Sequence, residues 1–376
     1  MKTLAIIVSL FCFPIIGFSQ QTIYGSITHD GMEREYILYV PAVYNGTEPV
    51  PMILNYHGYG SNAEEQMIYG DFRPTADTAG FLVIHPQGSL HFGITHWNVG
   101  GWTIGSTTDD VGFTSALIDS IAAEYNVDLN RVYATGMSNG GFMSFLLACQ
   151  LSDRIAAIAS VTGSMTPETY NECSCQHPQP ILQIHGTDDS VVPYTGALWS
   201  KPVEDVILYW VDYNHCIPTP VVTSLPDLDP NDGSTVDLYV YNEGDNDVSV
   251  EHYKVIGGDH TWPGNAIGGP GTNYDINASV EIWNFFSRYD INGTVGIEQT
   301  SNHLLISIYP NPTNSKITVE FQNPDPLGYE LISILGRSVL QGMITSDRRE
   351  IDLSRLSPDI YFLKVGNNTF KVLKIE

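Results

Sequence analysis

Short apolar runs follow one another through the first half of the chain, without the strict apolar and polar alternation of a half-exposed strand. Such runs are typical of strands that are buried on both faces of a sheet. They lie at residues 51–56, 81–85, 131–135, 155–161 and 180–185. Two alternating segments before them, residues 22–28 and 34–40, flank a His29-Asp30-Gly31 turn and predict an opening hairpin.

Helical patterns separate these runs, most clearly at residues 110–125 and 140–151. An amphipathic stretch at residues 277–289 predicts a closing helix. Strand, helix and strand at this spacing predict a mostly parallel sheet with helices on both faces, so the fold class is α/β. In an open sheet of this kind the ligand crevice lies beyond the carboxyl ends of the strands.

The two ends of the chain have patterns of their own. Residues 1–20 combine an early lysine with an apolar run of 15 residues, from Leu4 to Phe18, which predicts a cleaved signal peptide. A membrane anchor is the alternative, but spanning hydrocarbon takes about 20 residues, and we expect no membrane span. Residues 301–376 read as short alternating strands and predict a small β-sandwich. The expected domains are thus an enzyme body at residues 21–290, a linker at 291–300 and this tail.

Charge separates the body from the tail. Residues 21–299 contain 7 Lys and Arg against 34 Asp and Glu, a net charge of −27, whereas residues 300–376 contain 8 of each. Such a negative body would repel phosphates, so nucleic acid is not an expected partner. Neutral polymers and small neutral esters remain as candidate partners, although solubility alone would also account for the acidity.

One glycine-rich turn carries a candidate nucleophile. Gly136-Met137-Ser138-Asn139-Gly140 follows a predicted strand and opens a predicted helix, which is the setting of the G-x-S-x-G nucleophile elbow. The turn is so tight that flanking side chains would collide with the backbone, and the helix that follows directs its amides to the same place. A plain glycine-rich turn is the alternative, but the motif occurs once and in the required context. We therefore predict Ser138 as the nucleophile.

A serine hydroxyl needs a base, and the base needs a carboxylate that fixes its tautomer. In this fold the acid and then the histidine follow the serine along the chain. Asp189 lies in the loop after the 180–185 strand and is the predicted acid, with Asp188 as its alternative. His260 lies in a glycine-bounded loop and is the predicted general base.

Backbone amides for an oxyanion are expected at two places. The His57-Gly58-Tyr59-Gly60 loop follows the 51–56 strand and should supply the amide of Tyr59, and the residue after the nucleophile, Asn139, should supply the second. Trp97 and Trp262, on loops near the predicted site, are candidates for substrate binding.

Four cysteines remain after loss of the signal, which carries Cys12. An even number in an exported chain predicts two disulfides among Cys149, Cys173, Cys175 and Cys216. Because Cys173 and Cys175 are only two residues apart, we expect each to pair with one of the other two. A zinc site is the alternative, but the spacing matches no common zinc pattern, and no metal is expected.

Taken together, the motifs resemble the secreted polyhydroxybutyrate depolymerase and feruloyl esterase family, which has the α/β-hydrolase fold. The resemblance covers residues 21–289, and its motifs are residues 58–60, 97–98, 109–113, 133–141, 185–189 and 260–264. It implies the same triad of Ser138, Asp189 and His260. One departure is Asp259, where the family usually has another glycine.

The tail is similar to the C-terminal sorting domain of the type IX secretion system. Residues 308–312, 330–339 and 353–375 carry this resemblance, which implies the secretion machinery as a partner. A carbohydrate-binding module is the alternative, but the tail has few aromatic residues. The protein is then expected to cross the periplasm and to be secreted or attached to the cell surface.

The predicted function is that of a serine esterase, which hydrolyses carboxylic esters through an acyl-enzyme and needs no cofactor. The resemblance favours feruloyl or acetyl esters of plant polysaccharide, so the ester substrate could be polymeric. A polyhydroxybutyrate depolymerase is the first alternative, and a non-catalytic secreted binding protein on a hydrolase scaffold is the second.

Overall fold

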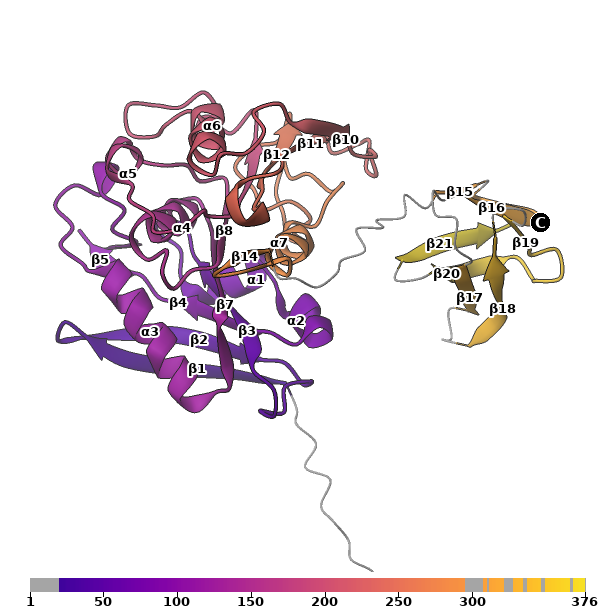
Figure 1. The fold of residues 1–376 in the computed structure, drawn as a ribbon, viewed down its shortest axis with the longest axis horizontal. Coiled ribbons are helices and arrows are strands. Elements are labelled where there is room, and N and C mark those ends of the chain that lie inside the picture. Colours follow the sequence, from indigo (N-terminus) through magenta and orange to yellow (C-terminus); the bar gives the residue numbers. More distant parts are fainter. Residues whose placement is uncertain are drawn as a thin grey trace, which may run out of the picture. The chain divides into compact units, whose positions relative to one another are not determined.

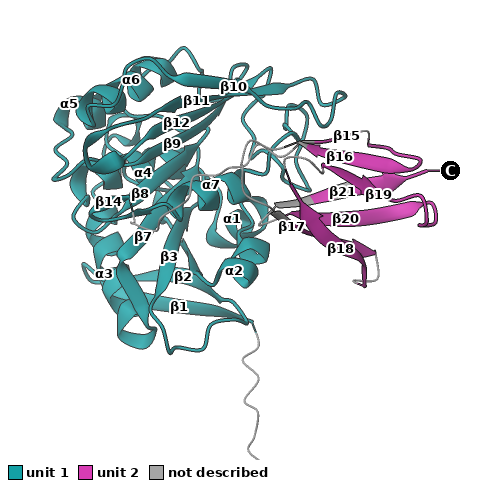
Figure 2. Cartoon of the chain, turned by 45° about the vertical axis from the view of Figure 1, so that its right-hand side comes forward, with its two compact units in different colours: residues 1–295 teal, residues 296–376 magenta. Residues whose placement is uncertain are grey.

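The chain divides into two compact units, residues 1–295 and 296–376 (Figure 2). The computed structural model describes residues 20–294 in the first unit. In the second it describes residues 307–309, 311–320, 327–333, 337–345, 349–365 and 368–375. Residues 1–19 of the predicted signal peptide lie outside the described residues, as do residues 295–300 of the predicted linker.

A ten-stranded sheet forms the centre of the first unit (Figure 1). Six central strands run parallel, in the spatial order β4 (Leu82–Pro86), β3 (Val50–Tyr56), β7 (Val127–Met137), β8 (Ala157–Val161), β9 (Ile181–Gly186) and β12 (Val250–Ile256). Antiparallel strands extend both edges: β2 (Met32–Val40) and β1 (Gln21–His29) beside β4, β11 (Thr235–Tyr241) and β10 (Val221–Ser224) beside β12. The prediction of an α/β fold with a mostly parallel sheet is confirmed.

The central strands are buried on both faces, which explains their continuous apolar runs. Along β3, Met52 and Leu54 face one hydrophobic core and Ile53 faces the other. The first core contains side chains of α3 (Asp110–Glu124), α4 (Asn139–Gln150) and α6 (Val203–Tyr213). The second contains side chains of α2 (Arg73–Ala79) and α7 (Ala278–Phe286).

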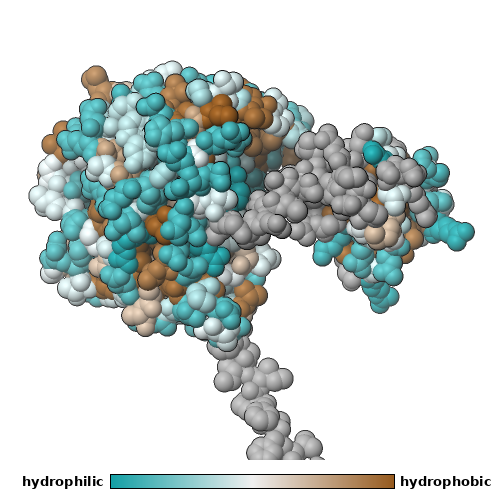
Figure 3. Space-filling view, in the orientation of Figure 1, coloured by the Kyte–Doolittle hydropathy of each residue, from teal (hydrophilic) through white to brown (hydrophobic). Residues whose placement is uncertain are grey.

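Several short elements between the strands were not predicted. They include α1 (Ala63–Tyr69), the β5–β6 hairpin (Ser89–His91, Ile94–His96), η1 (Gly101–Thr103), α5 (Pro167–Glu172) and η2 (Asp245–Asp247). The elements α2, α6, β10 and β11 were not predicted either. The hairpin β13–β14 (Tyr289–Asp290, Gly293–Thr294) ends the first unit and is joined to β7 by a hydrogen bond from the Ile291 amide to the Asn130 carbonyl. Hydrophilic side chains cover most of the face of this unit that is visible in Figure 3. None of the helices in the described residues is long and apolar enough to cross a membrane.

The second unit is β-rich, as predicted. One sheet joins β15 (Ser307–Tyr309), β16 (Lys316–Glu320) and β19 (Glu350–Asp352), and the other joins β18 (Ser338–Ile344), β17 (Leu327–Ser333), β20 (Asp359–Val365) and β21 (Asn368–Lys374). Alternate residues of these strands, including Leu331, Ile351 and Leu363, form a separate core.

Candidate active site

Ser138 lies at the turn from β7 into α4 and has an unusual backbone conformation. Its φ of 55° and ψ of −118° are rarely adopted by a residue with a side chain, a strain of about 1–3 kcal/mol. The turn fits only with glycine at its flanks, because a Cβ on Gly136 or Gly140 would lie 2.5 Å or 2.1 Å from the Tyr56 carbonyl oxygen. The Ser138 amide donates to the Val161 carbonyl at 2.9 Å. This geometry is that of a nucleophile elbow.

Asp189 and His260 come from loops after β9 and β12 and meet at the carboxyl edge of the sheet. His260 Nδ1 lies 2.8 Å from Asp189 Oδ2. The other carboxylate oxygen of Asp189 accepts from the amides of Val191 and Val192 at 2.9 Å and 2.8 Å. With a proton on Nδ1, the opposite nitrogen of the His260 ring is free to accept one.

A second histidine contacts the same carboxylate. His185 Nε2 lies 3.3 Å from Asp189 Oδ2 and 2.9 Å from the Val192 carbonyl, while its Nδ1 lies 2.9 Å from Gln183 Nε2. Burial alone would raise the pKa of Asp189, but the hydrogen bonds from His185 and His260 hold it below its ordinary value. Sequence reasoning gave His185 no role, although it is the first residue of the motif that contains Asp189.

Asp188 does not contact the histidine. Its side chain accepts from Thr187 Oγ1 at 3.1 Å, and its amide donates to the Gly258 carbonyl at 3.0 Å. The two aspartates that competed in the sequence thus have different neighbours, and only Asp189 lies within hydrogen-bonding distance of His260.

Asp259, where the family usually has glycine, connects the histidine loop to the acid loop. Its Oδ1 accepts from the His260 amide at 2.8 Å and from both the amide and the hydroxyl of Ser190 at 3.0 Å. Hydrogen bonds from the Ser190 and His260 amides lower the pKa of Asp259. The departure from the family pattern therefore adds a contact between the two loops.

Ser138 and His260 lie on the wall of one cavity of about 420 Å³. Residues of the 58–61 loop, helix α1, the end of β7 and one further loop complete the lining: Gly58, Tyr59, Ser61, Glu65, Gln66, Ile68, Tyr69, Met137 and Ile267. Tyr59 remains 44% exposed, and its ring packs edge-on against Trp102 with centroids 5.5 Å apart. The cavity offers an aromatic and aliphatic wall beside the serine.

The two predicted oxyanion donors lie close to Ser138. Asn139 is the first residue of α4, and an amide at that position has no intrahelical acceptor. The loop that carries Tyr59 approaches closely, because a Cβ on Gly58 would lie 3.5 Å from Ser138 Cβ. A hydrogen bond of 2.8 Å from the Gly60 amide to the Thr95 carbonyl fixes the far end of this loop.

The prediction that Trp97 and Trp262 bind substrate has to be corrected, because both side chains are fully buried. The indole N–H of Trp97 donates to the His57 carbonyl at 2.9 Å, and that of Trp262 lies 3.2 Å from Ser279 Oγ. Neither residue lines the cavity beside Ser138. Their loops lie near the site, but their rings pack inward and support its walls.

The cysteine prediction is also partly wrong. Cys149 and Cys173 form a disulfide, as the expected pairings allow, but Cys175 and Cys216 are free thiols. Cys175 donates to the Ala148 carbonyl at 3.0 Å, whereas Cys216 is buried 3.9 Å from the Val248 carbonyl. The two thiols therefore have different surroundings and do not form the second bridge.

Two groups of side chains in the described residues have a spacing that could suit a metal ion. One consists of Cys149, Cys173 and Cys175 and includes the disulfide, whose sulfurs are not thiolate ligands. The other consists of His29, Asp30 and Asp109, where His29 Nε2 lies 3.1 Å from an Asp109 carboxylate oxygen.

Comparisons with known proteins match two parts of the chain to known families. Residues 34–193 match the family described as esterase PHB depolymerase, and residues 307–375 match the secretion system C-terminal sorting domain. A bifunctional acetylxylan esterase/xylanase from Neocallimastix patriciarum is 30% identical over 266 residues, which cover 70% of this chain and 35% of that protein. Feruloyl esterase B from Piromyces equi is 32% identical over 198 residues, which cover 50% and 37%. The chain thus spans little more than a third of the length of these two relatives.

The fold also has a counterpart among solved structures. The acetyl xylan esterase from Aspergillus awamori superposes with a TM-score of 0.52 at 13% identity, covering 72% of this chain and 99% of that one. At this identity the likeness concerns the fold alone.

Proposed function

Because residues 34–193 belong to the esterase PHB depolymerase family and residues 307–375 to the secretion system C-terminal sorting domains, we propose that the protein is an exported serine esterase. The observation that carries the proposal is the 2.8 Å contact between His260 and Asp189 beside the strained Ser138, with Ser138 and His260 on one cavity wall. A nucleophile, a base and an orienting acid are the groups that acyl transfer requires.

The reaction begins when His260 Nε2 removes the proton from the Ser138 hydroxyl, whose oxygen attacks the ester carbonyl carbon. Asp189 keeps the Nδ1 proton of His260 in place and stabilises the imidazolium. His260 then returns the proton to the leaving alcohol, which leaves an acyl-enzyme on Ser138. In the second half of the cycle a water molecule replaces the alcohol, and the acid is released.

The amides of Tyr59 and Asn139 stabilise the oxyanion that forms on the carbonyl oxygen. Loss of one such donor typically costs about 3–4 kcal/mol of barrier. The Asn139 amide gains from its place at the start of α4, where the helix dipole favours negative charge.

For the substrate, we favour feruloyl or acetyl esters of plant polysaccharide. The names of the two relatives point in this direction, and a cavity of about 420 Å³ with Tyr59, Tyr69 and Ile68 in its wall has room for an aromatic acyl group. A polyester such as polyhydroxybutyrate is the second candidate, because the family that residues 34–193 match includes depolymerases of it.

One experiment tests both the chemistry and the substrate. Hydrolysis of methyl ferulate, acetylated xylan and a polyhydroxybutyrate film is measured side by side with the wild type and Ser138→Ala. We expect turnover of the first or second substrate by the wild type and none by the variant. A fluorophosphonate probe should label the wild type alone, and labelling that persists in Ser138→Ala would contradict the assignment of the nucleophile.

The tail gives the proposed destination. A sorting domain directs the enzyme through the secretion machinery, after passage of the periplasm, to the cell surface or the medium. An extracellular enzyme meets plant polymers directly, which is consistent with the proposed substrate.

A further inference from the structure

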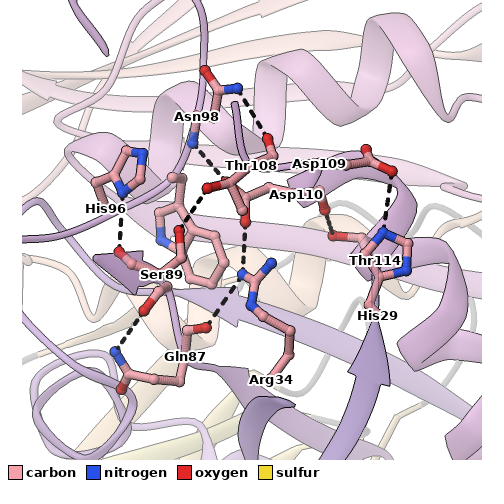
Figure 4. Close-up of polar contacts among 12 residues, drawn as sticks. His29, Arg34, Gln87, Ser89, His96, Asn98, Thr108, Asp109, Asp110 and Thr114 are labelled. Atoms are coloured by element: carbon pink, nitrogen blue, oxygen red, sulfur yellow. Dashed lines mark hydrogen bonds and ion pairs between the residues drawn. The ribbon is translucent and has the colours of Figure 1, made fainter. Parts of the chain in front are cut away.

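A buried ion pair lies between the edge of the sheet and the start of α3, outside the cavity that holds Ser138. Arg34 Nη2 of β2 lies 2.6 Å from Asp110 Oδ1, and the two side chains are only 3% and 0% exposed (Figure 4). The guanidinium also lies 3.9 Å from the centre of the Phe113 ring. A buried ion pair often contributes no net stability, because removing two charges from water costs free energy. The other hydrogen bonds of Arg34 and Asp110 therefore indicate the role of this pair.

Asp110 leads to one of the proposed oxyanion donors. Its second carboxylate oxygen, Oδ2, accepts from the Asn98 amide at 2.7 Å. The neighbouring Trp97 is joined to the Asn139 side chain by two hydrogen bonds, from the Trp97 amide to Asn139 Oδ1 at 2.7 Å and from Asn139 Nδ2 to the Trp97 carbonyl at 3.1 Å. Asp110 thereby fixes the segment that holds Asn139 in position.

Arg34 leads to the loop with the other donor. Its Nη2 also lies 3.4 Å from the Gln87 carbonyl (Figure 4), and the amide of the next residue, Gly88, donates to His57 Nε2 at 2.9 Å. His57 Nδ1 lies 2.7 Å from the Gly58 carbonyl, directly before Tyr59. Since Nε2 accepts from Gly88, the ring proton is on Nδ1 and is donated to that carbonyl.

The two routes also meet at a third contact. The Trp97 indole N–H donates to the His57 carbonyl, so the segment held by Asp110 contacts the loop supported by Arg34. The side chains of Arg34, Asp110, His57, Trp97 and Asn139 are buried, so water cannot substitute for one of them without rearrangement, whereas Gly58, Gln87 and Asn98 are half-buried.

We propose that the Arg34–Asp110 ion pair is a positioning element that aligns the amides of Tyr59 and Asn139 with each other. The inference rests on the proposed function, because it assigns the pair a role in stabilising the oxyanion. Neither residue touches the substrate. Oxyanion donors act only when they are held at the position that the developing charge will occupy, so a small displacement of either amide lowers the rate.

Asp110→Asn tests the proposal, because it removes the charge and changes the shape of the side chain very little. We expect kcat to fall about 10- to 100-fold with KM within about threefold, since the defect affects the transition state more than substrate binding. Arg34→Lys is a milder second variant. Lysine keeps the positive charge but lacks the planar guanidinium, so it cannot contact both the carboxylate and the Gln87 carbonyl. Because the charge is kept, we expect a smaller fall in kcat than in Asp110→Asn.

A trifluoromethyl ketone ester analogue provides a readout that lost stability alone would not change. It forms an oxyanion adduct on Ser138, so its affinity should fall in parallel with kcat, whereas the affinity for the product acid should stay the same. The matched control is Glu251→Gln on β12, which breaks the 2.7 Å ion pair with Arg288 and should leave both quantities unchanged in the folded protein.

The possible outcomes separate this inference from the proposed function. The kinetics are compared for each of the two variants, Arg34→Lys and Asp110→Asn, that folds. If these variants retain kcat and ketone affinity within about twofold of the wild type, the positioning role is wrong. An equal loss in Glu251→Gln would also overturn it. Failure of the proposed function itself would appear in the wild type, which would then hydrolyse no ester or would hydrolyse esters equally well in Ser138→Ala.

Discussion

Asp189→Asn would test the proposed triad most directly, because asparagine has almost the same shape as aspartate. Its Oδ1 could still accept from the amides of Val191 and Val192. Its NH2 group would replace Oδ2, which faces His260 Nδ1 at 2.8 Å and His185 Nε2 at 3.3 Å. Because His185 Nε2 donates to the Val192 carbonyl, its N–H stays in place and would face the new NH2 group, donor against donor.

The tautomer of His260 decides how large the effect is. To avoid a second N–H clash, His260 would accept at Nδ1 and carry its proton on Nε2, the nitrogen that has to accept the proton of Ser138. We therefore expect kcat to fall by about 10⁴-fold, a barrier increase of about 5 kcal/mol. The measurement is steady-state hydrolysis of a soluble aryl ester, with circular dichroism to establish that the variant is folded.

Asp188→Asn is the matched control, since that carboxylate contacts Thr187 Oγ1 and not the histidine. It should retain kcat within about twofold of the wild type, because only a loop contact changes. The reasoning would be refuted if Asp189→Asn lost less than about tenfold, or if the two variants lost activity equally.

Four further predictions concern other parts of the chain. Burial raises the pKa of the Cys175 and Cys216 thiols to about 12 and about 11, so both should be unreactive in the folded protein. Protein that lacks the signal peptide should show two thiols that react with Ellman's reagent only after unfolding, and four reactive thiols would contradict the disulfide. Burial lowers the pKa of His85 to about 3, so below pH 6.5 the unfolded state binds more protons than the folded state and the wild type loses stability. His85→Leu removes this group, so denaturant unfolding should show about 2 kcal/mol less loss of stability from pH 7 to pH 5 than in the wild type. Equal losses in the two proteins would contradict this. Asp259→Ala should lower kcat by about tenfold, whereas Asp259→Asn keeps an acceptor oxygen for Ser190 and should stay within about threefold in the same ester assay; equal effects would show that the charge matters rather than the contact. A chain that ends at residue 294 should keep its kcat/KM on a soluble ester but remain in the periplasm of the native host, and activity of this truncated form in the medium would contradict the sorting role.

The sequence predicted the parts of the site that follow from local rules. A serine at a strand-to-helix turn with a glycine two residues away on each side is restricted by backbone sterics, and the structure gives Ser138 a strained φ of 55°. Similarly, continuous apolar runs such as β3 and β9 cannot face water on either side, so the sheet and its parallel order could be predicted.

Residues whose roles depend on distant partners could not be predicted in this way. The ring of Trp97 packs inward because its indole reaches the carbonyl of His57, 40 residues away, and no periodic pattern records such a contact. The pairing of Cys149 with Cys173 depends in the same way on where α4 ends relative to α5. His185 was missed because a buried polar residue at a strand end looks like any other until its neighbour Asp189 has a position.

The two sides of the proposed site are held in different ways, and this has a consequence for mutation. On the side of the acid and the base, the Asp259 carboxylate is one side-chain contact between the loops, and other contacts are between backbone groups. The Thr187 amide donates to the Val255 carbonyl at 2.9 Å, and a Cβ on Gly186 would lie 2.1 Å from the Gly258 carbonyl oxygen. On the oxyanion side, the support runs through side chains and ends at a buried ion pair. Backbone contacts survive most side-chain substitutions, whereas a buried polar network loses its geometry when one member is removed. Apart from substitutions of Asp259, changes away from the reacting groups should therefore impair catalysis mainly through the oxyanion side.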